Sequence, residues 1–156
     1  MSSLGGRALP ALGQVGVVVK DLDQAMAYYR DVFGLGPFQV IEFTPEKHWV
    51  KGKPVPINLK IGLAQMGPVH FELIQPVAGD APHKWFLEEN GEGLQHLGFY
   101  LDDLDGWLSY LEAKGIEVLM NAETYVEGMG DVRAAYVESD KTGGVIFELI
   151  EVKPRA

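Results

Sequence analysis

The sequence contains no cysteine, and this absence excludes disulfide bridges, thiolate metal ligands and cysteine nucleophiles together. Basic residues are also scarce, because 13 lysines and arginines stand against 22 acidic residues and leave a net charge of −9. Such a surface repels a phosphate backbone, which argues against nucleic acid as a partner. No apolar run approaches the ~20 residues of a membrane span, and the first residues lack the apolar core of a signal peptide. We therefore expect a cytoplasmic protein that acts on a small molecule, away from membranes.

A repeat is the most informative feature that the sequence does contain. The tetrapeptide FELI occurs at residues 71–74 and again at residues 147–150. The stretch from Leu12 to Tyr28 also aligns with the stretch from Leu94 to Tyr110, with identical Leu, Gly, Asp and Tyr residues at matching places. Self-similarity of this length indicates a duplicated module.

The repeat predicts the organisation of the chain. After an N-terminal tail (1–9), we expect a first module (10–77), a linker with a short helix (78–91) and a second module (92–152) within one structural domain. Runs of β-forming residues, an amphipathic helical stretch and three further β-like runs follow one another in each module. The prediction is an α+β fold made of two tandem βαβββ modules.

Each module marks its helix with start and stop signals. Asp21 and Asp103 follow the first strand of their modules, where an Asp side chain can cap the helix N-terminus. Gly34 and Gly115 are placed to end the two helices, because glycine adopts the left-handed conformation that a helix C-terminus often needs. The segment between the predicted strands 38–43 and 57–66 is expected to be a loop, and the shape of the substrate pocket is expected to depend on residues 43–58.

Strand alternation places the two FELI glutamates. In each copy the Phe and Leu share one face of the strand, whereas Glu72 or Glu148 lies on the other. If the Phe and Leu face the helix of their module, both glutamates face the opposite, concave side of the sheet. A buried carboxylate needs a positive partner, and no Lys or Arg alternates with either glutamate.

A divalent metal ion is a natural partner for these carboxylates. His96 lies at the start of the first strand of the second module, and Gln14 occupies the matching position of the first. Gln14, Glu72, His96 and Glu148 would balance the charge of one divalent ion through three oxygens and one nitrogen. This set suits Co, Mn, Ni, Zn or Fe with open positions for a substrate.

Other interpretations remain open for some of these residues. Glu72 and Glu148 could each pair with a buried lysine such as Lys60 instead of a metal. His70 shares the face of Glu72 and could replace it or Gln14 as a ligand. His48 and His83 have polar, loop-like surroundings in the sequence and are expected to be solvated.

The strings QVGVVVKDLDQAMAYYRDVFGLGPF, GEGLQHLGFYLDDLDGWLSYLEAKGIEV and KTGGVIFELIE resemble the vicinal oxygen chelate superfamily. This superfamily includes glyoxalase I, methylmalonyl-CoA epimerase, extradiol dioxygenases and bleomycin-resistance proteins. The resemblance covers about Gln14 to Val152. It implies a half-open barrel, a curved mixed sheet with helices outside, around a metal bound at the positions of Gln14, Glu72, His96 and Glu148.

The three strings look closest to the epimerase branch. This resemblance implies an isomerase or epimerase that moves a proton α to a carbonyl through an enediolate, with an acyl-CoA thioester such as methylmalonyl-CoA as substrate. Glu148 would act as base as well as ligand, and TPEKHW resembles the segment that carries the second acid/base, which suggests Glu46. The resemblance also implies a homodimer.

Three alternatives follow from the same resemblance. A glyoxalase I-like lactoylglutathione lyase fits Gln at position 14, although no Arg follows it closely to hold glutathione. A metal-free binding protein of the bleomycin-resistance kind would not need the full ligand set. A ring-cleaving dioxygenase is expected to hold iron with two histidines and one carboxylate, whereas His96 is the one histidine of this predicted ligand set.

Overall fold

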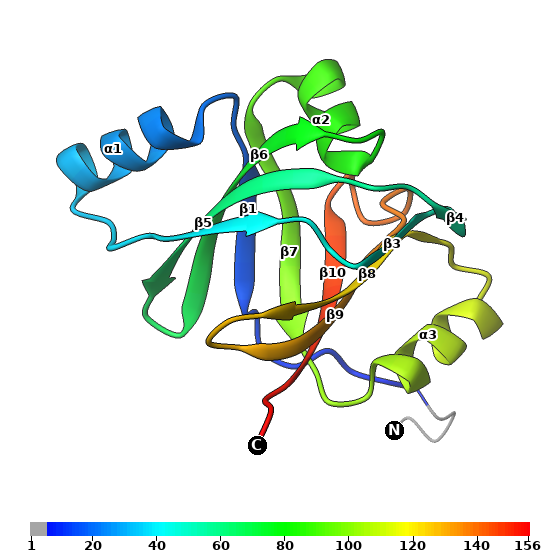
Figure 1. The fold of residues 1–156 in the computed structure, drawn as a ribbon. Helices are drawn as coiled ribbons and strands as arrows, with labels where there is room; N and C mark the ends of the chain where they lie inside the picture. Colours follow the sequence, from blue (N-terminus) through cyan, green and yellow to red (C-terminus); the bar gives the residue numbers. More distant parts are fainter. Residues whose placement is uncertain (1–5) are drawn as a thin grey trace.

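One mixed sheet forms the frame of the molecule in the computed structural model, which describes residues 6–156 (Figure 1). Its strands are β1 (Gln14–Val18), β2 (Gln39–Phe43), β3 (Lys47–Val50), β4 (Lys53–Pro54), β5 (Asn58–Met66), β6 (Val69–Ala78), β7 (Gly93–Tyr100), β8 (Val118–Val126), β9 (Gly130–Val137) and β10 (Ile146–Lys153). The helices of this part of the chain are α1 (Leu22–Phe33), α2 (Pro82–Asn90) and α3 (Leu104–Ala113). None of these helices has the length and hydropathy to cross a membrane.

The strand order shows the duplication. The strands follow each other as β2-β5-β6-β1-β7-β10-β9-β8-β3-β4. In each half the first strand runs parallel to the last one, β1 beside β6 and β7 beside β10, and the halves join through the antiparallel pair β1–β7. The sheet curls into a half-open barrel with α1 and α3 outside it (Figure 1). The predicted α+β fold with two βαβββ units is confirmed.

The segment between β2 and β5 is more regular than the sequence indicated. It forms the hairpin β3–β4, and β3 pairs with β8, so residues from the first half extend the sheet of the second half. The expectation of an irregular loop was wrong because the partner of β3 is distant in the chain. His48 on β3 is buried, with its Nδ1 2.8 Å from the carbonyl oxygen of Val55.

Both main helices begin and end at the predicted residues. The Asp21 carboxylate accepts a hydrogen bond from the backbone N–H of Gln24, and the Asp103 carboxylate accepts one from Gly106, each at 3.0 Å. Gly34 ends α1 with a φ of 66° and Gly115 follows α3 with a φ of 73°. Both values lie in the left-handed region that favours glycine.

Alternation along β6 and β10 divides their side chains between the two faces of the sheet. Leu73 packs with α1 residues, and Leu149 packs with α3 residues. Ile74 and Ile146 belong to a separate apolar cluster on the concave side. The glutamates of the two FELI copies therefore also point to the concave side, as the sequence predicted.

Candidate metal centre

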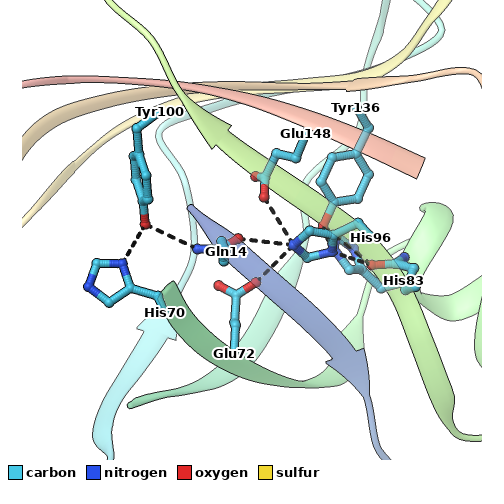
Figure 2. Close-up of polar contacts among 9 residues, drawn as sticks. Gln14, His70, Glu72, His83, His96, Tyr100, Tyr136 and Glu148 are labelled. Atoms are coloured by element: carbon cyan, nitrogen blue, oxygen red, sulfur yellow. Dashed lines mark hydrogen bonds and ion pairs between the residues drawn. The ribbon is translucent and has the colours of Figure 1, made fainter. Parts of the chain in front are cut away.

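The four predicted ligands come together at the centre of the sheet. They lie on the four adjacent strands β6, β1, β7 and β10, and all point into the half-barrel (Figure 2). His96 Nε2 lies 3.3 Å from Glu72 Oε1, 3.1 Å from Glu148 Oε1 and 3.0 Å from the Gln14 amide. The amide atom that points inward is also 2.9 Å from Glu148 Oε1 and 3.3 Å from Glu72 Oε1.

Two glycines make this close approach possible. Gly16 lies opposite His96 and Gly98 lies opposite Gln14 in the β1–β7 pair. A Cβ atom on Gly16 would overlap the imidazole ring of His96, and one on Gly98 would come within 2.9 Å of Gln14 Cβ. Each glycine is two residues after the ligand of its own strand and leaves space for the ligand of the neighbouring strand.

Burial makes the charges of this cluster interdependent. His96 is fully buried, and the side chains of Glu72 and Glu148 are only 12% and 13% exposed. Burial alone would lower the pKa of His96, but the carboxylates of Glu148 and Glu72 outweigh it and raise the pKa to about 10. Burial also raises the pKa of Glu72. Without a cation, the cluster therefore retains a proton at neutral pH.

A buried polar network holds the other side of the His96 ring. Nδ1 of His96 lies 3.0 Å from Gln95 Oε1 and 3.1 Å from the Tyr136 hydroxyl, which in turn contacts His83 Nε2 at 2.8 Å (Figure 2). If Nδ1–H donates to these oxygens, the Nε2 lone pair points at the carboxylates. Such contacts fix the tautomer that a metal-binding histidine needs.

The Gln14 amide has a comparable contact on its outer side. Its Nε2 lies 3.4 Å from the Tyr100 hydroxyl, which is 2.8 Å from His70 Nδ1 (Figure 2). In the reverse orientation the amide nitrogen points inward and donates to His96 Nε2, Glu72 Oε1 and Glu148 Oε1. A bound cation would instead require the amide oxygen to point inward. His70 itself contacts Tyr100 and not the converging atoms.

The donor set fits a divalent cation. Three oxygens and one imidazole nitrogen that all present lone pairs to one point repel each other unless a proton, an amide N–H or a cation lies between them. Ligand atoms about 2.1 Å from an ion and at right angles lie about 3 Å apart, and the contacts among these atoms measure 2.9–3.3 Å. Glu72, His96 and Glu148 could thus hold a metal ion, with Gln14 as the fourth predicted ligand.

An apolar cavity opens beside the cluster. The space between its walls is about 720 Å³ when the part open to solvent is included, and Gln14, Glu72 and Glu148 belong to its lining. Apolar side chains from both halves form most of its wall, among them Ile61, Ile74, Met120, Met129, Val132 and Ile150. A small molecule in this cavity would lie against the carboxylates of the cluster.

Glu46 lies apart from the other predicted site residues. It is exposed just before β3 and lines a separate surface groove with Lys47, Arg133 and Arg155. The structure thus brings Gln14, Glu72, His96 and Glu148 together and leaves Glu46 outside the cavity. Its catalytic role stays a prediction.

Several residues that contribute to the site were not predicted from the sequence. His83 was expected to be solvated, but it is buried on α2 and lines the cavity with Tyr136. A signal existed for Tyr100, because His96, Gly98 and Tyr100 alternate along one strand and so share a face. No comparable signal marked His83, whose burial depends on how the linker helix packs.

Sequence comparisons agree with this architecture. The family profile described as Glyoxalase/Bleomycin resistance protein/Dioxygenase superfamily matches residues 13–136. The uncharacterised protein YqjC of Bacillus subtilis (strain 168) is 28% identical over 142 residues, which cover 91% of this chain and 92% of YqjC. Mitochondrial methylmalonyl-CoA epimerase of Mus musculus is 29% identical over 143 residues, which cover 90% of this chain and 72% of the epimerase.

A solved structure shares the fold. A variant of Streptomyces coelicolor methylmalonyl-CoA epimerase, in complex with 2-nitronate-propionyl-CoA, superposes with a TM-score of 0.71 at 23% identity. The match covers 96% of this chain and all of that chain.

Proposed function

Because the chain belongs to the Glyoxalase/Bleomycin resistance protein/Dioxygenase superfamily, we propose that it is a divalent-metal-dependent epimerase or isomerase. The reaction is the transfer of a proton at the carbon next to a carbonyl group. One observation carries this proposal: Glu148 belongs to the converging cluster and at the same time borders the cavity. A carboxylate in that position can meet both a metal ion and the carbon of a substrate.

The roles of the residues follow from their positions. Gln14, Glu72, His96 and Glu148 would hold the ion, which when bound would supply a Lewis acid for the substrate oxygen. Glu148 accepts the proton from the neighbouring carbon, because a carboxylate within reach of that carbon is a suitable general base. The apolar wall excludes water and keeps the substrate against these groups.

Inversion of a carbon centre needs a second group on its opposite face. Glu46 is the residue predicted from the sequence, but it would have to approach the cavity from its surface groove. Glu72 borders the cavity already. The variant Glu46→Gln distinguishes these two candidates. If Glu46 is the second acid/base, the variant should invert the carbon centre more slowly while the exchange of its proton with solvent stays intact. If inversion is unchanged, Glu72 is the better candidate.

Acyl-CoA thioesters are the first substrates to test. The mouse and Streptomyces relatives are methylmalonyl-CoA epimerases, and the Streptomyces protein was solved with a CoA compound. We expect the purified protein to bind about one equivalent of Co or Mn and to incorporate solvent deuterium at the α-carbon of an acyl thioester. Elemental analysis and mass spectrometry measure these two results.

Glu148→Gln is the sharpest variant for the proposed chemistry. The amide keeps the size of the side chain but cannot accept the proton, so we expect exchange to fall by about 10²-fold or more. Circular dichroism should show an unchanged fold. Full exchange activity in this variant would show that the base is elsewhere, and failure to bind metal in the unaltered protein would overturn the proposal as a whole.

Lactoylglutathione lyase activity is the second function to assay. Its support is the ligand set itself, in which Gln occupies position 14. Hemithioacetal isomerisation measured beside thioester exchange distinguishes the two activities. A dioxygenase is less well supported, because His96 is the only histidine of the cluster and His70 contacts Tyr100 instead.

A further inference from the structure

The wall of the cavity beside the cluster carries few charged side chains. Most of its residues are apolar, and they come from both halves of the sheet, as Ile61 and Ile74 do from one half and Met129 and Ile150 from the other. Among the residues that the structure describes, no Lys or Arg lines this cavity. The charged side chains on its wall are Glu72 and Glu148, both negative when ionised.

The charge of the predicted ligand set is also balanced without a substrate. Gln14 and a metal-bound His96 are neutral, so the two carboxylates bring a total charge of −2 that balances a divalent ion. The loaded centre is therefore electrically neutral before any substrate enters. A negative group on the substrate would remain unbalanced in the cavity, because no Lys or Arg of residues 6–156 lines it to compensate the lost hydration.

We infer that the substrate of this site is uncharged in the part that enters the cavity: a neutral carbonyl compound with an apolar body. The inference rests on the proposed function for the location of the reacting carbon. It extends that proposal by excluding carboxylates such as methylmalonate from the preferred substrates. Anionic parts of a carrier, such as the phosphates of CoA, would stay outside the cavity.

Charge also remains balanced during the proposed proton transfer. When Glu148 accepts the proton from the α-carbon, its carboxylate becomes neutral. The electron pair of the broken C–H bond forms a C=C double bond, and the π pair of the carbonyl group moves to the substrate oxygen. The total charge of centre and substrate is unchanged by this step. With a neutral substrate it is zero throughout, whereas a carboxylate-bearing substrate makes it −1.

A matched pair of ligands tests the inference. The pantetheine thioester of methylmalonate and the same thioester with its carboxylate capped as a methyl ester differ by one negative charge and one methyl group. Isothermal titration of the cobalt-loaded protein should show the ester binding at least about tenfold more tightly than the acid, because a further negative charge without a cationic partner is strongly disfavoured in a dry site. Equal or tighter binding of the acid, or no detectable binding of either compound, would overturn the inference.

A protein variant provides an independent test of the cause. Glu72→Gln lowers the negative charge of the ligand set by one while keeping the shape of the side chain. At saturating metal, with metal content verified by elemental analysis, the preference for the ester should shift toward the acid by about tenfold. Glu42→Gln is the matched control, because Glu42 is exposed on β2 and should leave the ratio unchanged. The same ratio in both variants would contradict the charge argument.

The two proposals can fail separately. Deuterium exchange into either thioester tests the proposed proton transfer, whereas the titration tests charge preference without any turnover. Tight ester binding without exchange would leave the charge inference supported and the proposed reaction wrong. Deuterium exchange together with tighter binding of the acid would support the proposed reaction and overturn the charge inference.

Discussion

At Gly16 and Gly98, single atoms decide whether the four predicted ligands can come together. Each occupies a place where a Cβ atom would meet a ligand of the neighbouring strand. The ligands sit on paired strands whose Cα atoms lie about 5 Å apart, so a full imidazole ring between them needs a neighbour without a side chain. This explains why the ligand-x-Gly pattern occurs at both Gln14 and His96.

The first prediction follows from these glycines. Gly16→Ala should displace the His96 ring and weaken metal binding by about 100-fold or more, with a cost to stability of about 1–3 kcal/mol. Gly98→Ala should have a smaller effect, because its Cβ would be 2.9 Å from Gln14 Cβ. Metal titration measures both. Gly6→Ala is the control, since nothing lies within 4 Å of its Cβ position; equal affinities in all three variants would contradict the argument.

The protonation of the cluster makes a second prediction at the residue scale. The pKa of His96 is raised to about 10 in the absence of a metal, so an incoming ion must displace a proton. Metal affinity should therefore rise about tenfold per pH unit between pH ~6 and ~8. Calorimetric titrations in buffers of different ionisation enthalpy should show release of at least one proton. A pH-independent affinity would show that the cluster is already deprotonated.

The same pKa shift affects the stability of the metal-free protein, with a definite sign. The pKa of His96 is about 10 in the folded protein and 6.5 in its ordinary state, so the folded protein binds this proton more tightly than the unfolded chain does. This contribution is complete below pH 6.5 and disappears as the pH rises toward about 10. Addition of metal should remove this alkaline loss of stability, because the ion replaces the proton.

At the scale of secondary-structure elements, the residue after each FELI copy links the last strand to the helix of the same half. Gln75 Oε1 accepts a hydrogen bond from the backbone N–H of Leu22 at 2.9 Å, and Glu151 Oε2 accepts one from Leu104 at 3.1 Å. Leu22 and Leu104 are the first residues of α1 and α3. Each FELI copy and the residue after it thus supply a core face, a glutamate of the cluster and a contact for the helix N-terminus.

These contacts predict a ranked effect on stability. Glu151 is buried and also lies near Arg133, so Glu151→Ala should lower the free energy of unfolding by about 2–3 kcal/mol. Gln75→Ala should cost about 1 kcal/mol. Glu151→Gln should keep most of the stability that Glu151→Ala loses, because the amide of Gln75 already accepts the corresponding hydrogen bond at the start of α1.

Urea denaturation measures this ranking, with Glu89→Ala as the control at an exposed position of α2. If Glu151→Ala unfolds at the same urea concentration as the control, the contact with α3 contributes nothing. Metal affinity should change little in these variants, because neither side chain belongs to the converging cluster.

The sequence predicted the elements that follow a local rule. The repeat predicted the order of strands and helices, Asp21 and Asp103 predicted the helix starts, and alternation predicted the direction of Glu72 and Glu148. The hairpin β3–β4 was missed because its pairing with β8 depends on a strand that lies far away in the chain. His83 was missed for a related reason, since the polar sequence around it carries no period that reveals which face of α2 is buried.

At the scale of the whole molecule, the centre connects the two halves of the sheet. Gln14 and Glu72 come from β1 and β6, whereas His96 and Glu148 come from β7 and β10. The halves are also joined by the β1–β7 pair, by the β3–β8 contact and by the apolar cluster that contains both Ile74 and Met120. An ion bound to all four residues would therefore stabilise both halves at once, and not a single module.

This arrangement leads to the last prediction. Because the folded state alone brings the four ligands together, metal at about 100 times its Kd should add about 2.7 kcal/mol to the free energy of unfolding. Calorimetry should show one thermal transition that moves to higher temperature, and hydrogen exchange should slow at amides of both β6 and β10. Glu72→Gln should reduce the shift in both halves, although Glu72 belongs to only one of them. Added protection confined to the half that contains β7 and β10 would mean that Gln14 and Glu72 do not hold the ion.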